Sequence, residues 1–264
     1  MSRPARVDVV LRLLDHQVVD PDDAPVGNVD DIGLDLHSQG CAVVALCVGV
    51  GSLGHRWPGR LGAWTVAGWR RLHPGEDARS GLVPVGEITA ITSAVAVTAP
   101  AARRLEASFG AENWLREHVI APIPGSGEDD SRPAYRFESP VLPVSGELVS
   151  LGQLLQCQVR DADGRALGGV NDVHADLRWD GDRVGAIVVT DLSFGPRGTG
   201  SVLGYNRDRH QGPWLVGKLV RFLHRRELRA PWPDVAEVDL RGRVVRLRPG
   251  SRPRHPLDEE AGRR

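Results

Sequence analysis

The sequence predicts a mainly β protein that consists of two similar domains. The segment 154–190 alternates apolar and polar residues between two tight turns, which is typical of strands with one buried face. The segment 13–36 matches the segment 154–177 without a gap at an offset of 141 residues, and 11 of the 24 aligned residues are identical. A chain of 264 residues also has room for two domains of about 100 residues each.

Two turns divide the segment 154–190 into three predicted strands. The turns lie at 161–164 and 180–182, and both combine Asp, which bonds nearby backbone, with Gly, which adopts the positive φ that hairpin turns often need. The apolar residues that alternate along the strands are Leu155, Cys157 and Val159, then Val173, Ala175 and Leu177, then Val184, Ala186 and Val188. We therefore expect one face of this sheet to pack on a core.

The repeated segment indicates an internal duplication of a whole domain. The identical residues of the first copy are Leu13, Leu14, Gln17, Val18, Asp20, Asp22, Gly27, Val29, Asp31, Asp35 and Leu36. A loose continuation at the same offset aligns Gly40, Val43 and Ala45 with Gly181, Val184 and Ala186. A second pattern recurs later, with 84–88 opposite 231–235. The offset far exceeds the roughly 20–50 residues of a solenoid repeat, so the duplicated unit is a small domain.

The repeated residues resemble the opening of the PRC-barrel domain. Both copies, 14–32 and 155–173, begin with the pattern Leu-x-x-Gln-Val, in which the polar residue Gln precedes Val, and they end with Gly-x-Val-x-Asp and an apolar residue. The turn pattern Asp-x-x-Gly is complete in the second copy, whereas the first has Asp23 in place of Gly164. The segments 231–238 and 244–247 are similar to the closing hairpin of that family. The resemblance implies two small β-barrels, and it identifies a fold and not a site.

We divide the chain into four regions on this basis. They are a first PRC-like barrel at 7–98, a helical segment with a proline-rich acidic linker at 99–147, a second PRC-like barrel at 148–250, and a disordered tail at 251–264. Pro100 suits the first turn of a helix because its missing N–H would have no partner there. A further helix, inserted in the second barrel at 213–226, is predicted from apolar residues at helical spacing.

No catalytic or metal-binding pattern is visible, and we expect no cofactor. The chain lacks the G-x-S-x-G and H-E-x-x-H motifs and has no closely spaced Cys and His residues. The acidic residues Asp20, Asp22, Asp23, Asp30 and Asp31 fit turn chemistry better than a calcium loop, since no terminal bidentate Glu follows. His174 follows an inward-facing valine and is predicted to lie on the surface.

The composition is that of an ordinary globular protein. Its formal net charge of −1 gives no overall attraction to nucleic acid or to anionic membranes. The three cysteines, Cys41, Cys47 and Cys157, lie in apolar segments, so we expect buried reduced thiols rather than disulfides. No apolar run is long enough to span a bilayer, and we expect a cytoplasmic protein.

A basic segment is the best functional lead. Between residues 207 and 254 there are 13 Lys or Arg against 5 Asp or Glu. The candidate binding residues are Trp214, Lys218, Arg221, Arg225, Arg226 and Arg229. They could contact phosphates or an acidic partner, although such residues more often form a solvated helix face. The acidic linker of the same chain is another possible partner.

The sequence favours a binding module over an enzyme. Small barrels are filled by their own side chains, so ligands use the loops and outer faces. The PRC-barrel family includes the cytoplasmic domain of the photosynthetic reaction-centre H subunit and the C-terminal domain of a ribosome-maturation factor, which share a fold and not a function. We therefore expect an adaptor that binds another protein, with an RNA- or ribosome-associated factor as the alternative.

Overall fold

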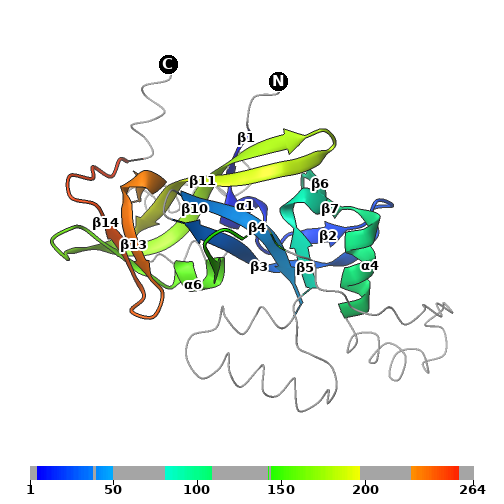
Figure 1. Cartoon of the computed structure of the whole chain (residues 1–264), viewed down its shortest axis with the longest axis horizontal. Coiled ribbons are helices and arrows are strands. Elements are labelled where there is room, and N and C mark those ends of the chain that lie inside the picture. Colours follow the sequence, from blue (N-terminus) through cyan, green and yellow to red (C-terminus); the bar gives the residue numbers. More distant parts are fainter. Residues whose placement is uncertain are drawn as a thin grey trace, which may run out of the picture.

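The computed structural model describes residues 5–37, 40–49, 81–108, 142, 144–196 and 227–255. These residues form a mainly β structure with fourteen strands, which confirms the mainly β part of the predicted fold class (Figure 1). The predicted helix at 213–226 and most of the linker lie outside the described residues. In the part of the chain that is described, no helix is long and apolar enough to cross a membrane.

The elements occur twice in the same order, as the predicted duplication requires. The first repeat consists of β1 (Ala5–Asp8), α1 (Val9–Arg12), β2 (Gln17–Val19), β3 (Pro25–His37), β4 (Gly40–Val48), β5 (Gly81–Pro84), the 3-10 helix η1 (Val85–Glu87), β6 (Ile88–Ile91) and β7 (Val95–Val97). The second consists of β8 (Glu147–Ser150), α6 (Leu151–Leu155), β9 (Gln158–Arg160), β10 (Ala166–Asp180), β11 (Arg183–Gly195), β12 (Leu228–Pro231), η3 (Trp232–Asp234), β13 (Val235–Asp239) and β14 (Val244–Leu247). The helix α4 (Ala99–Ser108) follows the first repeat.

The order of strands in the sheet is a mirror image about its centre. It runs β13-β14-β9-β10-β11-β4-β3-β2-β7-β6, so each strand of one repeat has its counterpart at the same distance from the middle. The central pair, β4 and β11, is antiparallel, with Val43 opposite Ile187 and Ala42 opposite Val188. The sheet curls like half of a barrel, with β13 and β14 at one end and β6 and β7 at the other (Figure 1). The division into two separate barrels stays a prediction.

The first strand of each repeat pairs with the long strand of the other repeat. β1 lies antiparallel to β10, and β8 lies antiparallel to β3. The two pairings have the same register, because Ala5 faces Leu177 and Glu147 faces Leu36, which is the counterpart of Leu177 in the duplication. The predicted domain boundaries do not anticipate this exchange, which connects the repeats through their first strands.

Local turn chemistry confirms both predicted hairpin turns. Gly164 and Gly181 have positive φ values of 83° and 64°, a conformation that favours glycine. The amide of Gly164 donates to the carbonyl of Asp161 at 3.1 Å. The prediction that Leu155 lies in the first of these strands is wrong, because Leu155 ends the helix α6. The hydroxyl oxygen of Ser150 accepts a hydrogen bond from the Gln153 backbone amide, and the side-chain oxygen of Gln153 accepts one from the Ser150 backbone amide. This capping box starts the helix.

The second hairpin is longer than the ungapped alignment predicts. Val83 pairs with Leu46, and its counterpart in the second repeat, Ala230, pairs with Leu192. Leu46 and Leu192 are therefore equivalent at an offset of 146, so the loose alignment of Ala45 with Ala186 is wrong. The predicted closing repeat is confirmed, because β5, η1 and β6 recur as β12, η3 and β13.

The two repeats share one apolar core. The buried cluster includes Leu34 and Leu46 of the first repeat with Leu177 and Leu192 of the second. Each fully buried Val or Leu side chain contributes about 2 kcal/mol to stability. Helix α4 adds Leu105 to this cluster, which confirms a helix at the start of the predicted interdomain segment. Separating the repeats would therefore expose apolar surface.

The start of the predicted disordered tail is paired with the second repeat. Arg254 forms an isolated antiparallel bridge with Arg229 of β12, with backbone hydrogen bonds of 2.7 and 2.8 Å. The hydroxyl of Ser251 also donates to the carboxylate of Asp234 at 2.9 Å. Residues 256–264 lie outside the described residues.

Candidate functional site

Of the six predicted binding residues, the described part of the chain includes Arg229. Trp214, Lys218, Arg221, Arg225 and Arg226 lie outside the described residues. Arg229 is half-buried in β12, where it pairs with Ser193 of β11. Its backbone bridge to Arg254 brings a second guanidinium group to the same corner of the molecule.

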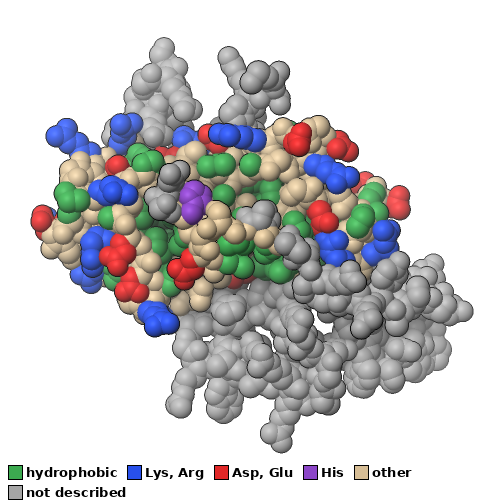
Figure 2. Space-filling model, in the orientation of Figure 1, with side chains coloured by type: hydrophobic (Ala, Val, Ile, Leu, Met, Phe, Trp, Pro, Cys, Tyr) green, Lys and Arg blue, Asp and Glu red, His purple; other side chains and the backbone are tan. Residues whose placement is uncertain are grey.

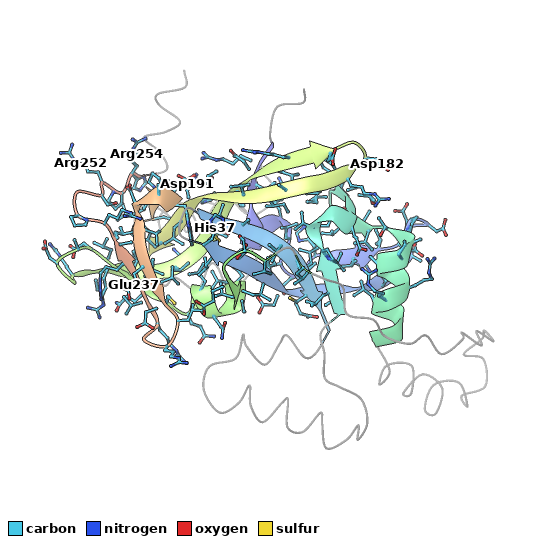
Figure 3. The ribbon with its side chains drawn as sticks, viewed as in Figure 1. His37, Asp182, Asp191, Glu237, Arg252 and Arg254 are labelled. Atoms are coloured by element: carbon cyan, nitrogen blue, oxygen red, sulfur yellow. The ribbon has the colours of Figure 1, made fainter. Side chains whose placement is uncertain are left out.

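We call Arg229, Arg252 and Arg254 the cationic corner. Arg252 and Arg254 are exposed, and Figure 3 shows both at the same edge of the molecule as β12. The nearby carboxylate of Asp191 is engaged by Arg6, whose guanidinium lies 2.6 Å away. The corner can therefore attract phosphates or acidic side chains through its two exposed guanidinium groups. The excess of Arg between residues 207 and 254 was the signal for this corner in the sequence.

A second set of polar groups lies where β8 and α6 of the second repeat dock on β3. Asp31 of β3 is only 2% exposed, and its carboxylate accepts hydrogen bonds from the amides of Ile32 at 2.8 Å and Gly152 at 3.0 Å. The hydroxyl of Ser150 donates to its other oxygen. Asp31 thus binds the N-terminus of α6, where a negative charge is favourable. We call this contact the first junction.

Asp35 of β3 reinforces the same docking by binding the residues just before β8. Its buried carboxylate accepts from the Ser145 amide and hydroxyl, both at 2.9 Å, and from the Gly146 amide at 2.8 Å. Burial alone would raise the pKa of Asp35, but these hydrogen bonds outweigh it and lower the pKa below its ordinary value. The ionised carboxylate is therefore the form that holds the two repeats together.

Turn chemistry accounts for only part of the acidic segment. Asp20 accepts from the amides of Asp22 at 2.9 Å and Ala24 at 2.8 Å, as a turn residue does. For Asp31 the turn interpretation is wrong, since it lies in β3 and binds the second repeat. The recurrence of Asp31 and Asp35 in the duplicated segment was the available signal, but their partners are more than 100 residues away in the chain.

The counterpart contact, between β1 with α1 and β10, is the second junction. Asp172, the equivalent of Asp31, accepts from the amides of Val10 of α1 at 2.9 Å and Val173 at 2.7 Å. Asp8 takes the place of Ser150, and His174 takes the place of Gly33. His174 Nδ1 lies within hydrogen-bonding distance of the Asp8 carboxylate.

The prediction that His174 lies on the surface is wrong. Its side chain is 1% exposed, because β1 pairs with this part of β10 and Asp8 lies opposite His174 in the register. Its Nε2 is buried and has no hydrogen-bond partner among the described residues. The alternation of the strand indicates a face but does not show which neighbouring strand covers it.

The second junction can exchange a proton near neutral pH. Burial of its carboxyl group, together with the nearby Asp8 carboxylate, raises the pKa of Asp172 to about 6, against the opposing effects of the Val10 amide, His174 and the Val173 amide. The Cys47 thiol, unlike the Asp172 carboxyl group, does not exchange a proton near neutral pH. Burial raises the pKa of Cys47 to about 12, so the thiol stays protonated. Cys41 and Cys157 are buried and Cys47 is half-buried, and no disulfide joins these three residues. Among the described residues, no group of His, Cys, Asp and Glu is placed to hold a metal ion.

Exposed apolar side chains mark two further places. Trp179 is 37% exposed near the tip of the β10–β11 hairpin, and Leu148 is 50% exposed in β8. Apolar surface also lies in the middle of the face in Figure 2, beside the exposed histidine that Figure 3 labels His37. Alternation would place Trp179 with Leu177 on the core side. A register shift between Arg178 and Trp179 ends that pattern, so sequence analysis missed Trp179.

Comparison of the chain with known protein families and with curated proteins found no match.

Proposed function

We propose that this protein is a non-enzymatic cytoplasmic adaptor, built from two PRC-barrel-like units, that binds another protein. The observation that carries the proposal is the exposed Trp179 beside the tip of the β10–β11 hairpin. The tip also carries the exposed residues Arg178 and Arg183. Trp and Arg are the residues most enriched among those that dominate binding energy at protein interfaces.

The use of the buried polar groups supports binding rather than catalysis. The carboxylates of Asp31, Asp35 and Asp172 accept hydrogen bonds from backbone amides of the opposite repeat. Catalytic groups have to face a substrate, whereas these groups are occupied in holding strands and helices together. Trp179, Arg178 and Arg183, in contrast, are on the outer surface, which is where an adaptor binds its partner.

The adaptor proposal is tested by replacing the exposed tryptophan. We expect Trp179→Ala to reduce capture of the natural partner about tenfold or more in affinity purification with quantitative mass spectrometry. Leu148→Ala is the matched control, because it removes an exposed apolar side chain from a different element. A protein that recovers no specific partner at native salt, or a Trp179→Ala variant that recovers the same partners in the same amounts, would contradict the proposal.

The alternative function is an RNA- or ribosome-associated factor that uses the basic segment. The exposed guanidinium groups of Arg252 and Arg254 at the cationic corner favour it. RNA affinity should then fall steeply as salt increases, because bound phosphates release counterions. The test compares wild-type protein with a variant in which Arg221, Arg225 and Arg226 are changed to Glu. An RNA affinity equal to that of the wild type would rule this function out.

A further inference from the structure

The exchange of first strands is reciprocal down to individual residue pairs. Val7 lies opposite Ala175, and Val149 lies opposite Leu34, which is the counterpart of Ala175. The same equivalence relates the pair Ala5 and Leu177 to the pair Glu147 and Leu36. The two dockings are therefore one interaction made twice in opposite directions.

The helices that follow the exchanged strands repeat this reciprocity. Asp31 of the first repeat accepts from an amide at the start of α6, and Asp172 of the second accepts from an amide at the start of α1. The two aspartates occupy equivalent positions of the duplicated segment, and the residue there is identical in both copies. Each repeat thus contributes a strand and a helix to the other, and receives the same elements at its own long strand.

The centre of the sheet has the geometry of a two-fold axis. The equivalence of Leu46 with Leu192 makes Ala42 equivalent to Val188, and these two residues face each other in the pairing of β4 with β11. A rotation that superimposes each repeat on the other would therefore leave this pair of residues in place. An interface in which the same surface occurs on both sides is the isologous contact of a two-fold dimer.

Gly146, just before β8, lies so close to β3 that a side chain would not fit at this position. A Cβ atom added to Gly146 would lie 1.9 Å from the carbonyl oxygen of Leu36 and 2.7 Å from its carbonyl carbon. Since both atoms belong to the backbone of β3, they cannot move aside without disturbing the strand. Backbone that is this close to backbone is typical of a specific docking site.

We propose that the edge of β3 or β10, with its aspartate, is a docking site for the strand–helix segment of a second copy of the same repeat. A single repeat is then an obligate strand-exchanged dimer module, and this chain contains such a dimer in one polypeptide. The partner that fits the site has an extended strand and a helix N-terminus that donates amides to the aspartate, and at the edge of β3 it also has a residue without a side chain just before the strand.

The test cuts the full chain between its repeats. A protease site is placed within residues 109–141, the folded protein is cleaved, and the two pieces are analysed by native mass spectrometry and size-exclusion chromatography. We expect the pieces to remain together as a one-to-one complex. Pieces that separate into independently folded monomers would overturn the proposal, because each would then fold without the strand of the other.

A glycine variant shows whether the exchanged strand itself holds the pieces. Gly146→Ala should weaken the association of the cleaved pieces about tenfold, whereas Gly86→Ala, which has nothing within 4 Å of the added Cβ, should change it less than about twofold. In the uncleaved Gly146→Ala variant, hydrogen exchange should become faster in β8 and α6 alone. Equal association of both variants, or faster exchange throughout the protein, would contradict a local docking site.

Discussion

The two junctions have the same scaffold but different chemistry. At the first junction Asp31 meets the neutral hydroxyl of Ser150, and Gly33 has no side chain. At the second junction Asp172 lies near a second carboxylate, Asp8, which in turn contacts His174. Duplication therefore preserved the contact between aspartate and helix, while the residues around the aspartate diverged. The comparison shows that the same backbone contact places its aspartate beside a neutral hydroxyl at the first junction and beside a second carboxylate, which raises the pKa of Asp172, at the second.

The largest expected effect is at the first junction. Asp31→Ala should reduce the free energy of unfolding by about 4 kcal/mol, because it leaves several buried donors without an acceptor. Urea unfolding at pH 7 measures the change. The matched variant Asp172→Ala should reduce the free energy of unfolding by less, because burial already disfavours the ionised carboxylate of Asp172 at that pH. An equal loss in the two variants would contradict the contrast between the junctions.

The second prediction concerns the pH dependence of the second junction. The folded pKa of Asp172, about 6, lies above the ordinary value of 3.8, so its contribution is fully present below about pH 4. That contribution is lost as the pH rises through 6, and it amounts to at most about 3 kcal/mol. The variant Asp172→Asn cannot ionise at this position. Its free energy of unfolding should therefore rise relative to that of the wild type between pH 4 and pH 7. A constant difference across this range would refute the prediction.

Copying one residue from the first junction into the second sharpens the comparison. Asp8→Ser removes the neighbouring negative charge and supplies a hydroxyl like that of Ser150, so it should lower the pKa of Asp172. Carbon-13 NMR titration of the Asp172 carboxyl group measures the change directly. The carboxyl resonance of Asp35 serves as an internal control, since its partners are Ser145 and Gly146 of the other junction. An unchanged Asp172 pKa would show that Asp8 has no influence on it.

A smaller effect is expected from the strand start at the first junction. Ser145→Ala removes the hydroxyl that donates to Asp35 and should reduce the free energy of unfolding by about 1 kcal/mol. The pKa of Asp35 is lowered on folding, so the stability that it contributes is present above the ordinary pKa and is lost as the pH falls. Urea unfolding at pH 7 and at pH 3 should therefore show a larger difference at the higher pH. A difference of the same size at both values would argue against this linkage.

The smallest effect is expected at the counterpart of Asp35. Asp176 lies 3.9 Å from the guanidinium of Arg6, and both side chains are more than a third exposed. Solvent screens such pairs, so Asp176→Asn should change the free energy of unfolding by less than about 1 kcal/mol. Thermal unfolding in low and in high salt measures this change. A loss as large as that of Asp31→Ala would mean that the two junctions do not differ as described.

Parts of the candidate sites were accessible to sequence analysis and parts were not. The excess of Arg predicted a basic binding surface, and of its six candidate residues the described part of the chain includes Arg229, so this surface stays a prediction. The turn of Asp20 was also predicted correctly, because its donors are only a few residues away. Asp31 and His174 were misassigned, because the strands that bury them come from the opposite repeat.

The sequence by itself determined the mainly β class, the duplication, both hairpin turns and the recurring closing elements. These features depend on alternation, glycine positions and similarity between segments, which all act over short distances along the chain. Only the tertiary structure decided which long strand receives each first strand. The alternation in β1 and β8 fits any sheet edge with an apolar face, and the choice depends on a close backbone approach and on buried aspartates more than 100 residues away.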